Sequence, residues 1–267
     1  MYIDEITFMY PIEKGGYSTV WKVRYNNKYY ALKMIDKDKL KTKIQKKMLK
    51  TEIKIHKPLR HENIIKLYNS FEDDFFSYIL LELGEEDLFN YMDKYDNMKM
   101  KEHEAIDIAY QIAKGLYYLN DQNVIHGDLK LENILLIGKK AKICDFGLSS
   151  QNFYHYSYIG TPEFMAPEII QRKMYDNGID IWSYGVMLFY MVYGFSPFYT
   201  RQSNSSSIDS SKTEHKICHT DIPFPEDDDK ILVQDLIKKC LTKNAKDRIN
   251  VKNLLNHSLF KKFRTIN

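Results

Sequence analysis

The sequence predicts an α+β fold with two lobes, a smaller one built on an antiparallel sheet and a larger one that is mainly helical. In roughly the first 80 residues, short runs rich in β-branched and aromatic residues alternate with turn signals. The pair Asn26-Asn27, for example, separates the runs 19–23 and 29–35. Further along, apolar residues recur three or four positions apart, as on a helix with one buried face. We expect the lobes to join at a hinge near 82–84.

The smaller lobe is expected to contain one main helix. A lysine-rich stretch over 43–58 provides it, and the apolar runs 64–68 and 78–83 are interpreted as further strands. Seven lysines lie within 37–50. We interpret them as a solvated helix face, with docking of an acidic partner or an anionic lipid as the alternative.

The larger lobe is expected to consist of helices. Helical spacing of apolar residues extends over 104–122 and over 231–241. The most apolar stretch, 181–193, is too short to span a bilayer and is interpreted as a buried helix. The segment 202–212 is rich in Ser and Asn and is predicted to be a surface loop.

The bulk composition is that of a globular protein forming a single domain over 1–267. The hydrophobic content of 44% is ordinary, and a net charge of +3 gives no reason to expect a nucleic-acid partner. Asp4 and Glu5 stand where a signal peptide needs apolar residues, and no segment is expected to span a membrane. The three cysteines are widely spaced and odd in number, which favours a reducing location in the cytoplasm, the nucleus or both. The oligomeric state is left open.

Two short motifs carry the chemistry. Residues 126–133 read HGDLKLEN and residues 145–147 read DFG. Phosphoryl transfer needs phosphates that are held still, a metal that neutralises developing charge, and a positioned acceptor hydroxyl. The two motifs, in this order, resemble the catalytic loop and the metal-binding motif of the protein kinase family.

The resemblance extends from about Ile6 to Phe260 and implies the bilobal protein kinase fold. Its N-lobe, about 1–83, would hold an antiparallel sheet and one main helix, and its C-lobe, about 85–267, would be mainly helical. The family's cofactors are ATP and Mg²⁺, and its substrates are protein hydroxyls.

The subfamily is indicated by the segments 31–37, 52–56 and 67–73, which are most similar to the polo-like and Aurora kinases. This similarity implies a mitotic or centrosomal role. The calcium/calmodulin-type kinases share much of the same pattern.

The resemblance also implies a role for each polar residue of the two motifs. Asp128 would orient the acceptor hydroxyl and accept its proton, while Lys130 would stabilise charge in the transition state. Asn133 and Asp145 would bind Mg²⁺, which prefers hard oxygen ligands. The pattern D-L-K-x-x-N is typical of Ser/Thr kinases rather than tyrosine kinases.

The nucleotide site is expected at the first strands and the hinge. The family's glycine-rich loop is eroded here, because Gly15 is the only one of its three glycines in place and Glu13 occupies the first position. We expect the Glu13 side chain to point away from the phosphates. Lys33 resembles the lysine that holds the α- and β-phosphates, with Glu52 as its partner. The residues expected to contact ATP, or to support such contacts, are Ile12, Gly15, Gly16, Val20, Ala31, Lys33, Glu52, Leu81, Glu82, Leu83, Asp87, Glu132 and Leu135.

A third motif distinguishes protein kinases from small-molecule phosphotransferases. Residues 160–168, GTPEFMAPE, resemble the family segment that docks a peptide substrate. Within it, Glu168 is expected to pair with Arg248. Asp180 is expected to bind the backbone of the catalytic loop.

Gly127 departs from the family, which usually has an arginine at this position. That arginine pairs with a phosphorylated residue of the activation loop. We therefore predict activity with weak dependence on activation-loop phosphorylation. Ser157 lies where a phosphoacceptor is often found, and the rings of Tyr154, Tyr156 and Tyr158 are interpreted as packing this loop.

Substrate preference is predicted from acidic residues. Glu132 resembles the glutamate that, in basophilic kinases, meets an arginine three residues before the acceptor. The acidic run 85–87 could add to this potential, and Tyr190 replaces a glutamate that some relatives use for a second basic position. We predict a moderate preference for one upstream basic residue, with a plain solvated surface as the alternative.

The main alternative function is that of a pseudokinase, a nucleotide-binding scaffold without catalysis. The eroded glycine loop and Gly127 favour it. The intact set of chemical residues counts against it: Lys33, Glu52, Asp128, Asn133 and Asp145.

Overall fold

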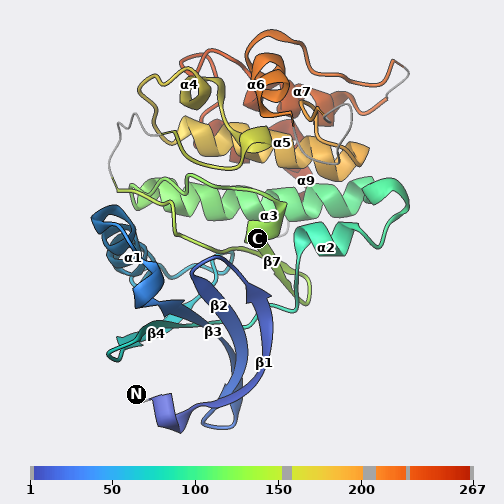
Figure 1. Cartoon of the computed structure of the whole chain (residues 1–267). Helices are drawn as coiled ribbons and strands as arrows, with labels where there is room; N and C mark the ends of the chain where they lie inside the picture. The colour runs from blue at the N-terminus through green and yellow to red at the C-terminus, as the bar shows by residue number, and fades with distance from the viewer. Residues whose placement is uncertain (1–2, 152–157, 201–208, 227–228, 265–267) are drawn as a thin grey trace.

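The smaller lobe is a five-stranded antiparallel sheet with one long helix against it. The computed structural model describes residues 3–151, 158–200, 209–226 and 229–264. The strands follow the order β1-β2-β3-β5-β4 and form the lower part of Figure 1. Their bounds are β1 (Thr7–Lys14), β2 (Ser18–Tyr25), β3 (Lys28–Asp36), β4 (Leu67–Glu72) and β5 (Phe76–Leu81).

Alternation along the strands gives this sheet two apolar faces. One face carries Val23, Leu32 and Leu80 in a cluster of its own. The opposite face, with Ile35 and Ile79, packs against α1 (Lys43–His56). Because side chains alternate along a strand, Lys33 lies on the face that also receives α1.

The larger lobe begins with a small three-stranded sheet, β6-β7-β8, beside the lobe junction. Its strands are β6 (Glu86–Asp87), β7 (Ile134–Ile137) and β8 (Lys140–Ile143). The 3-10 turn η4 (Leu131–Asn133) leads directly into β7, so the catalytic-loop motif lies at the start of a sheet hairpin.

Helices build the rest of the larger lobe around α3 and α5, which run across it one above the other in Figure 1. Almost every residue of α5 is buried, because α3 and α7 pack against it. Gly185 permits the close approach of α7, since a Cβ at this position would lie 2.6 Å from the Cβ of Cys240. The helices are α2 (Leu88–Met92), α3 (Glu102–Asp121), α4 (Pro167–Ile170), α5 (Gly178–Tyr193), α6 (Ser210–His219), α7 (Ile231–Cys240), α8 (Val251–Leu255) and α9 (Lys261–Arg264), and the remaining 3-10 turns are η1 (Ile3–Glu5), η2 (Lys37–Lys39), η3 (Asp96–Met98), η5 (Pro162–Phe164) and η6 (Ser258–Phe260).

Most predicted elements are confirmed. The turn between β2 and β3 has positive φ at both Asn26 (47°) and Asn27 (59°), as a two-residue hairpin loop requires. The buried helix, the two helices with apolar spacing and the lysine-rich helix are α5, α3, α7 and α1. No helix in the described part of the chain is long and apolar enough to cross a bilayer. The three cysteines are free thiols.

Two predicted boundaries are wrong. Only Leu67 and Tyr68 of the run 64–68 belong to the first sheet, because Ile64 bridges to Ile143 of β8 and Ile65 N–H donates to the Ile143 carbonyl. Ile64 and Ile65 are buried outside that sheet, and β4 starts only at Leu67. The predicted loop 202–212 overlaps α6, whose first turn is capped by Asp209. Residues 201–208 lie outside the described part of the chain.

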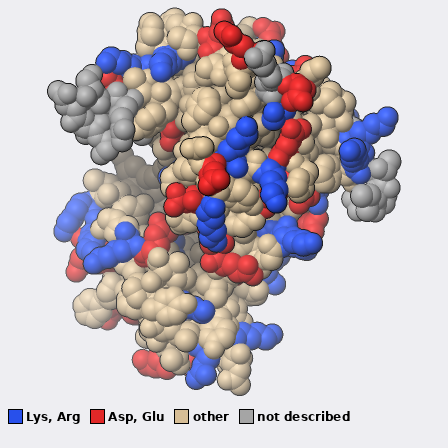
Figure 2. Space-filling model, turned by 90° about the vertical axis from the view of Figure 1, so that its right-hand side faces the viewer, with Lys and Arg blue, Asp and Glu red and all other residues tan. Residues whose placement is uncertain are grey.

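The surface carries no large field of one sign on the face shown in Figure 2. There, lysine and arginine side chains are interspersed with aspartate and glutamate. This mixture agrees with the small net charge of +3.

Candidate active site

Lys33 lies at the centre of a three-residue ionic cluster that joins the two lobes. Its Nζ is 2.7 Å from Glu52 Oε1 on α1 and 3.0 Å from Asp145 Oδ1 just after β8. Burial acts to lower the pKa of Lys33, but the two carboxylates outweigh it and raise this pKa above its ordinary value. Lys33 is therefore held as a cation at the junction.

Asp145 is an ionised carboxylate that is only partly covered. Burial acts to raise its pKa, yet the adjacent Lys33 cation dominates and lowers it. The side chain remains 48% exposed, so it has a face open to a ligand. Its backbone has a φ of 57°, a left-handed conformation that aspartate tolerates better than most residues.

Asp128 is fixed by groups from two directions. The backbone N–H and the hydroxyl of Thr161 both donate to Oδ1 at 2.9 Å. Lys130 Nζ lies 3.6 Å from Oδ2, and Asn133 Nδ2 donates to the Asp128 carbonyl at 2.8 Å. Oδ1 is thus occupied, which leaves Oδ2 as the oxygen that can face a substrate.

Thr161 was missed as a site residue by the sequence reasoning, although its segment was recognised. The signal that could have identified it is its hydroxyl, one residue after Gly160. Gly160 has a φ of 101°, and a Cβ there would meet the Gly127 carbonyl at 3.1 Å. Glycine lets the segment approach the catalytic loop closely enough for Thr161 to reach Asp128.

The backbone of the catalytic loop is bound by the buried Asp180 of α5. Its two oxygens accept hydrogen bonds from the backbone N–H groups of His126 (2.7 Å) and Gly127 (3.0 Å), as predicted. Burial raises the pKa of Asp180, and these N–H donors oppose that effect. A carboxylate that accepts two buried backbone N–H groups fixes the loop without taking part in its chemistry.

Phe146 lies between two histidines that come from different lobes. Its ring centroid is 4.4 Å from that of His56 on α1 and 5.2 Å from that of His126. The His56 ring nitrogen Nε2 is 2.7 Å from the Ile65 carbonyl, and the side chain is buried. Ring contacts through Phe146, one tilted and one edge-to-face, therefore connect α1 to the catalytic loop.

The oxygen atoms near this cluster fit a magnesium ion. Asn133 donates its amide nitrogen to Asp128, so its amide oxygen is left as a ligand, and Asp145 offers carboxylate oxygen. No group of three or more His, Cys, Asp or Glu side chains within the described ranges could form a closed metal cage. Two oxygen ligands suffice for Mg²⁺ that takes the rest of its shell from phosphate and water.

The glycine-rich segment forms the hairpin between β1 and β2, where Gly15 N–H donates to the Ser18 carbonyl at 2.8 Å. A bulge lies in β1, so that Ile12 and Glu13 together oppose Val20. Val20 in turn pairs with Lys33, and paired residues share a face. This register puts Glu13 on the sheet face that carries Lys33, and our expectation that its side chain points away from the phosphates stays a prediction.

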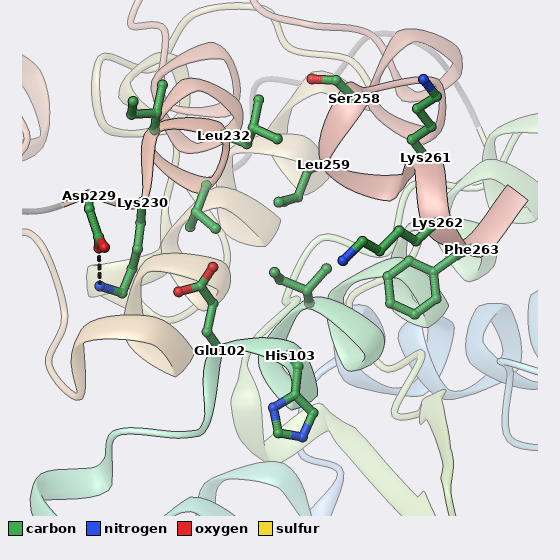
Figure 3. Close-up of a pocket in the computed structure, with 13 residues that line it drawn as sticks. Glu102, His103, Asp229, Lys230, Leu232, Ser258, Leu259, Lys261, Lys262 and Phe263 are labelled. Atoms are coloured by element: carbon green, nitrogen blue, oxygen red, sulfur yellow. Dashed lines mark ion pairs between the residues drawn. The ribbon is translucent and has the colours of Figure 1, made fainter.

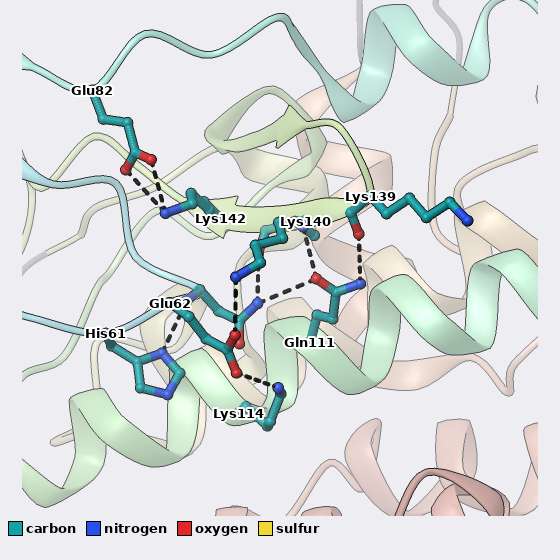
Figure 4. A network of polar contacts seen from close by, with 10 residues as sticks. His61, Glu62, Glu82, Gln111, Lys114, Lys139, Lys140 and Lys142 are labelled. Atoms are coloured by element: carbon teal, nitrogen blue, oxygen red, sulfur yellow. Dashed lines mark hydrogen bonds and ion pairs between the residues drawn. The ribbon is translucent and has the colours of Figure 1, made fainter. Parts of the chain in front are cut away.

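The hinge is anchored by the side chain of Glu82, which binds across to the larger lobe (Figure 4). Its carboxylate lies 3.0 Å from Lys142 Nζ on β8 and accepts from Lys66 N–H at 3.1 Å. The carboxylate is therefore engaged by the protein, and the backbone carbonyl of Glu82 is what remains for a ligand. Leu83 N–H has no hydrogen-bond acceptor among the described residues.

The remaining predicted nucleotide contacts surround this hinge. Ala31 pairs with Leu81 across β3 and β5, and Leu135 pairs with Asp87 across β7 and β6. Gly84 is needed for space, since a Cβ there would lie 3.0 Å from Leu135. Asp87 also caps α2, because its Oδ1 accepts the Asn90 N–H at 2.9 Å.

The segment after Gly160 is locked onto the helical core. Arg248 binds Glu168 through two nitrogen–oxygen contacts of 2.6 and 2.9 Å, as predicted, and both side chains are buried. Ser183 on α5 donates to the Phe164 carbonyl at 2.8 Å. Ser157, Tyr154 and Tyr156 lie outside the described residues, so their predicted roles stay predictions. Tyr158 donates to Glu214 of α6.

An acidic corner lies beside this segment. Glu132 is exposed, and its charge acts on both Glu163 and Tyr190. Burial raises the pKa of Glu163, and the charge of Glu132 adds to this effect. The run 85–87 is engaged elsewhere, for example by the ion pair between Glu86 and Lys94 at 2.6 Å.

A separate groove of about 660 Å³ lies between the start of α3, the start of α7 and the last helical turns (Figure 3). Leu232, Leu259 and Phe263 give it apolar walls, and Asp229 pairs with Lys230 at its edge. Neither Asp128 nor Asp145 lines it, so it does not belong to the cluster described above.

Comparison with known proteins places this geometry in context. Residues 7–260 match the family described as the protein kinase domain. Serine/threonine-protein kinase PLK4 of Nematostella vectensis is 35% identical over 262 residues, which cover 96% of this chain and 26% of that protein. PLK4 of Drosophila willistoni is 32% identical, with 97% and 33% covered, and calcium-dependent protein kinase 5 of Plasmodium falciparum (isolate 3D7) is 37% identical, with 99% and 47% covered. The chain thus spans between about a quarter and a half of the length of these relatives.

Proposed function

The chain belongs to the protein kinase family, and from that premise we propose that it transfers the γ-phosphate of ATP to serine and threonine hydroxyls of proteins. The observation that carries the proposal is the contact of Lys33 with both Glu52 and Asp145, at 2.7 and 3.0 Å. This contact brings a cation for the phosphates and a carboxylate for the metal into one cluster. A scaffold without catalysis would have no need to hold both charges so close together.

The acceptor hydroxyl would bind at Asp128. Because Thr161 occupies Oδ1, the proton would pass to Oδ2, and Lys130 at 3.6 Å from that oxygen would stabilise the charge that develops nearby. The position of Asp128 would persist through the reaction because Asp180 holds the loop backbone.

ATP would lie between the smaller sheet and β7. The Glu82 carbonyl would accept a hydrogen bond from the edge of the adenine, with Val20, Ala31 and Leu135 against its faces. Lys33 would bind the phosphates. Asn133 and Asp145 would hold Mg²⁺, which when bound neutralises charge on the phosphates.

We further propose that activity depends little on activation-loop phosphorylation. Gly127 offers no side chain to pair with a phosphate, while Asp180 and Thr161 already fix the loop through protein contacts. A Ser157→Ala variant should keep its activity; its inactivation would overturn this part of the proposal.

The proposed substrate carries a basic residue upstream of the acceptor. Support comes from Glu132, which is exposed next to the partly buried Glu163. A degenerate peptide array should show enrichment of arginine or lysine before the acceptor, and an array without such enrichment would refute this preference.

The alternative of a nucleotide-binding scaffold is favoured by one observation, the carboxylate of Glu13 on the face of Lys33. A single experiment separates the two functions. Purified protein is incubated with Mg-ATP and a generic basic protein substrate, beside an Asp145→Asn control. Transfer by the wild type alone supports the kinase, whereas ATP binding without transfer supports the scaffold.

A further inference from the structure

One face of α1 carries a continuous row of exposed lysines. Successive residues of a helix are about 100° apart, so positions spaced by three and four fall within an arc of about 100°. All six side chains on this arc are exposed, and α1 lies at the left edge of Figure 1 with its outer side away from the sheet. We call this set the lysine stripe: Lys43, Lys46, Lys47, Lys50, Lys54 and Lys57.

The lysine stripe is not neutralised by the protein itself. In the part of the chain that the structure describes, none of its six members forms an ion pair within 4.0 Å. Lysines just before the helix do so, since Lys37 pairs with Glu72 at 3.0 Å and Lys39 with Asp36 at 3.7 Å. Lys50 lies within electrostatic range of Glu72, but that carboxylate is already bound to Lys37.

The lysine charges destabilise a helix whose first turns bury no side chain. Like charges spaced by three and four residues destabilise a helix, and cations in the first turn oppose the helix dipole. The first half of α1 buries no side chain; the buried residues are Glu52, Ile55 and His56. The capping box formed by Thr42 and Gln45 is what holds its first turn.

We propose that the lysine stripe binds an acidic segment of a partner protein. The stripe is about 20 Å long and one side chain wide, which matches a single acidic peptide chain. Glu72 lies within electrostatic range of Lys50, so a flat anionic bilayer would also meet negative charge beside the stripe. It contains no arginine or aromatic side chain of the kind that reads nucleic acid.

Binding is tested without reference to catalysis. The probe is a fluorescein-labelled peptide of about 14 residues rich in glutamate, the length of α1, titrated with the whole chain and followed by anisotropy. Replacing Lys43, Lys47, Lys50 and Lys54 by glutamine should weaken binding at least about tenfold, and replacing them by arginine should preserve it. Glutamine retains helix propensity, so α1 should remain folded.

A matched control removes the same charge elsewhere. The exposed lysines 99, 101, 139 and 252 are replaced by glutamine, and the peptide should bind this variant within about twofold of wild type. Equal binding by the stripe variant and the control would overturn the proposal. Tighter binding to phosphatidylserine vesicles or to duplex DNA than to the peptide would overturn the choice of partner.

Discussion

Thr161 holds Asp128 by two hydrogen bonds to the same oxygen, one from its backbone N–H and one from its hydroxyl, each 2.9 Å long. A carboxylate held twice at Oδ1 cannot rotate freely, so Oδ2 keeps a constant direction toward the side of Lys130. The position of Asp128 thus depends on a residue of the segment proposed to dock the substrate. Disorder of that segment would therefore also release Asp128 from its fixed orientation.

Thr161→Ala should lower kcat about 10- to 100-fold, because it removes one of the two bonds that orient Asp128. The KM for ATP should stay unchanged, since the nucleotide site is built from other residues. Steady-state kinetics provide the measurement, and Thr161→Ser, which keeps the hydroxyl, should recover most of the rate. A kcat of Thr161→Ala equal to that of wild type would show that the backbone bond suffices.

Glu52→Gln should reduce kcat/KM for ATP about 10- to 100-fold. The amide keeps nearly the same shape as the carboxylate but lacks its negative charge. Of the two carboxylates that contact Lys33, only Asp145 then remains. The measurement is the ATP dependence of phosphate transfer. Glu62→Gln is a matched control, because Glu62 lies in an exposed ion-pair network with Lys114 and Lys140 (Figure 4) and should leave the rate unchanged. A similar loss in both variants would contradict the assignment.

Glu13→Gly should tighten ATP binding, by about threefold to tenfold, because the bulge places this carboxylate on the face where the phosphates are proposed to lie. Isothermal titration with Mg-ATP measures the effect. Raising the salt concentration should reduce the difference between variant and wild type. Weaker binding by Glu13→Gly would mean that the carboxylate supports the loop instead of repelling the nucleotide.

Sequence reasoning identified local features with a strong residue signature. Asn26-Asn27, the partners Glu168 and Arg248, and the support of the loop by Asp180 are such cases. Sequence reasoning did not identify features that depend on strand register or on contacts between distant segments. The bulge that puts Glu13 on the sheet face of Lys33 follows from how β1 pairs with β2, which no composition rule specifies.

The same limit applies to burial and to hydrogen bonding across the lobes. The run 64–68 has the composition of a strand, but Ile64 is buried by a bridge to β8 that a local pattern cannot contain. The role of Thr161 arises from its distance to a residue 33 positions earlier. Glu82 was predicted at the nucleotide, and no local pattern indicated that its carboxylate pairs with Lys142 of β8.

Gly127→Ala should destabilise the fold by about 2 kcal/mol or more, through two separate effects. Its φ of 83° is left-handed, and a Cβ would lie 3.0 Å from the Leu148 carbonyl. Gly138→Ala isolates the effect of the left-handed backbone, because φ there is 57° and a Cβ would meet nothing within 4 Å. Its loss in the free energy of unfolding should be about 1 kcal/mol. Denaturant unfolding measures both, and equal losses would show that the contact with Leu148 relaxes freely.

His56 should make the stability of the fold depend on pH. Burial lowers its pKa to about 4, the charges of Lys33 and His126 act in the same direction, and the bond to the Ile65 carbonyl opposes them. In the unfolded chain a histidine titrates near about 6.5. Between these two values the unfolded chain binds a proton that the folded chain does not, so the free energy of unfolding falls as pH drops.

The stability contribution of neutral His56 is therefore complete above about pH 6.5 and is lost as the pH falls toward 4. The loss attributable to it should reach about 2 kcal/mol at about pH 5. Urea unfolding at about pH 7 and pH 5 measures it in wild type and in His56→Gln, which keeps a donor for the Ile65 carbonyl but has no charge to gain. The change in the free energy of unfolding between the two pH values is measured for each protein. Subtracting the change in His56→Gln from that in wild type removes the contributions of His61 and the carboxylates, which both proteins share. If the difference between wild type and His56→Gln does not change with pH, His56 is not the titrating group, and its ring contact with Phe146 is insensitive to protonation.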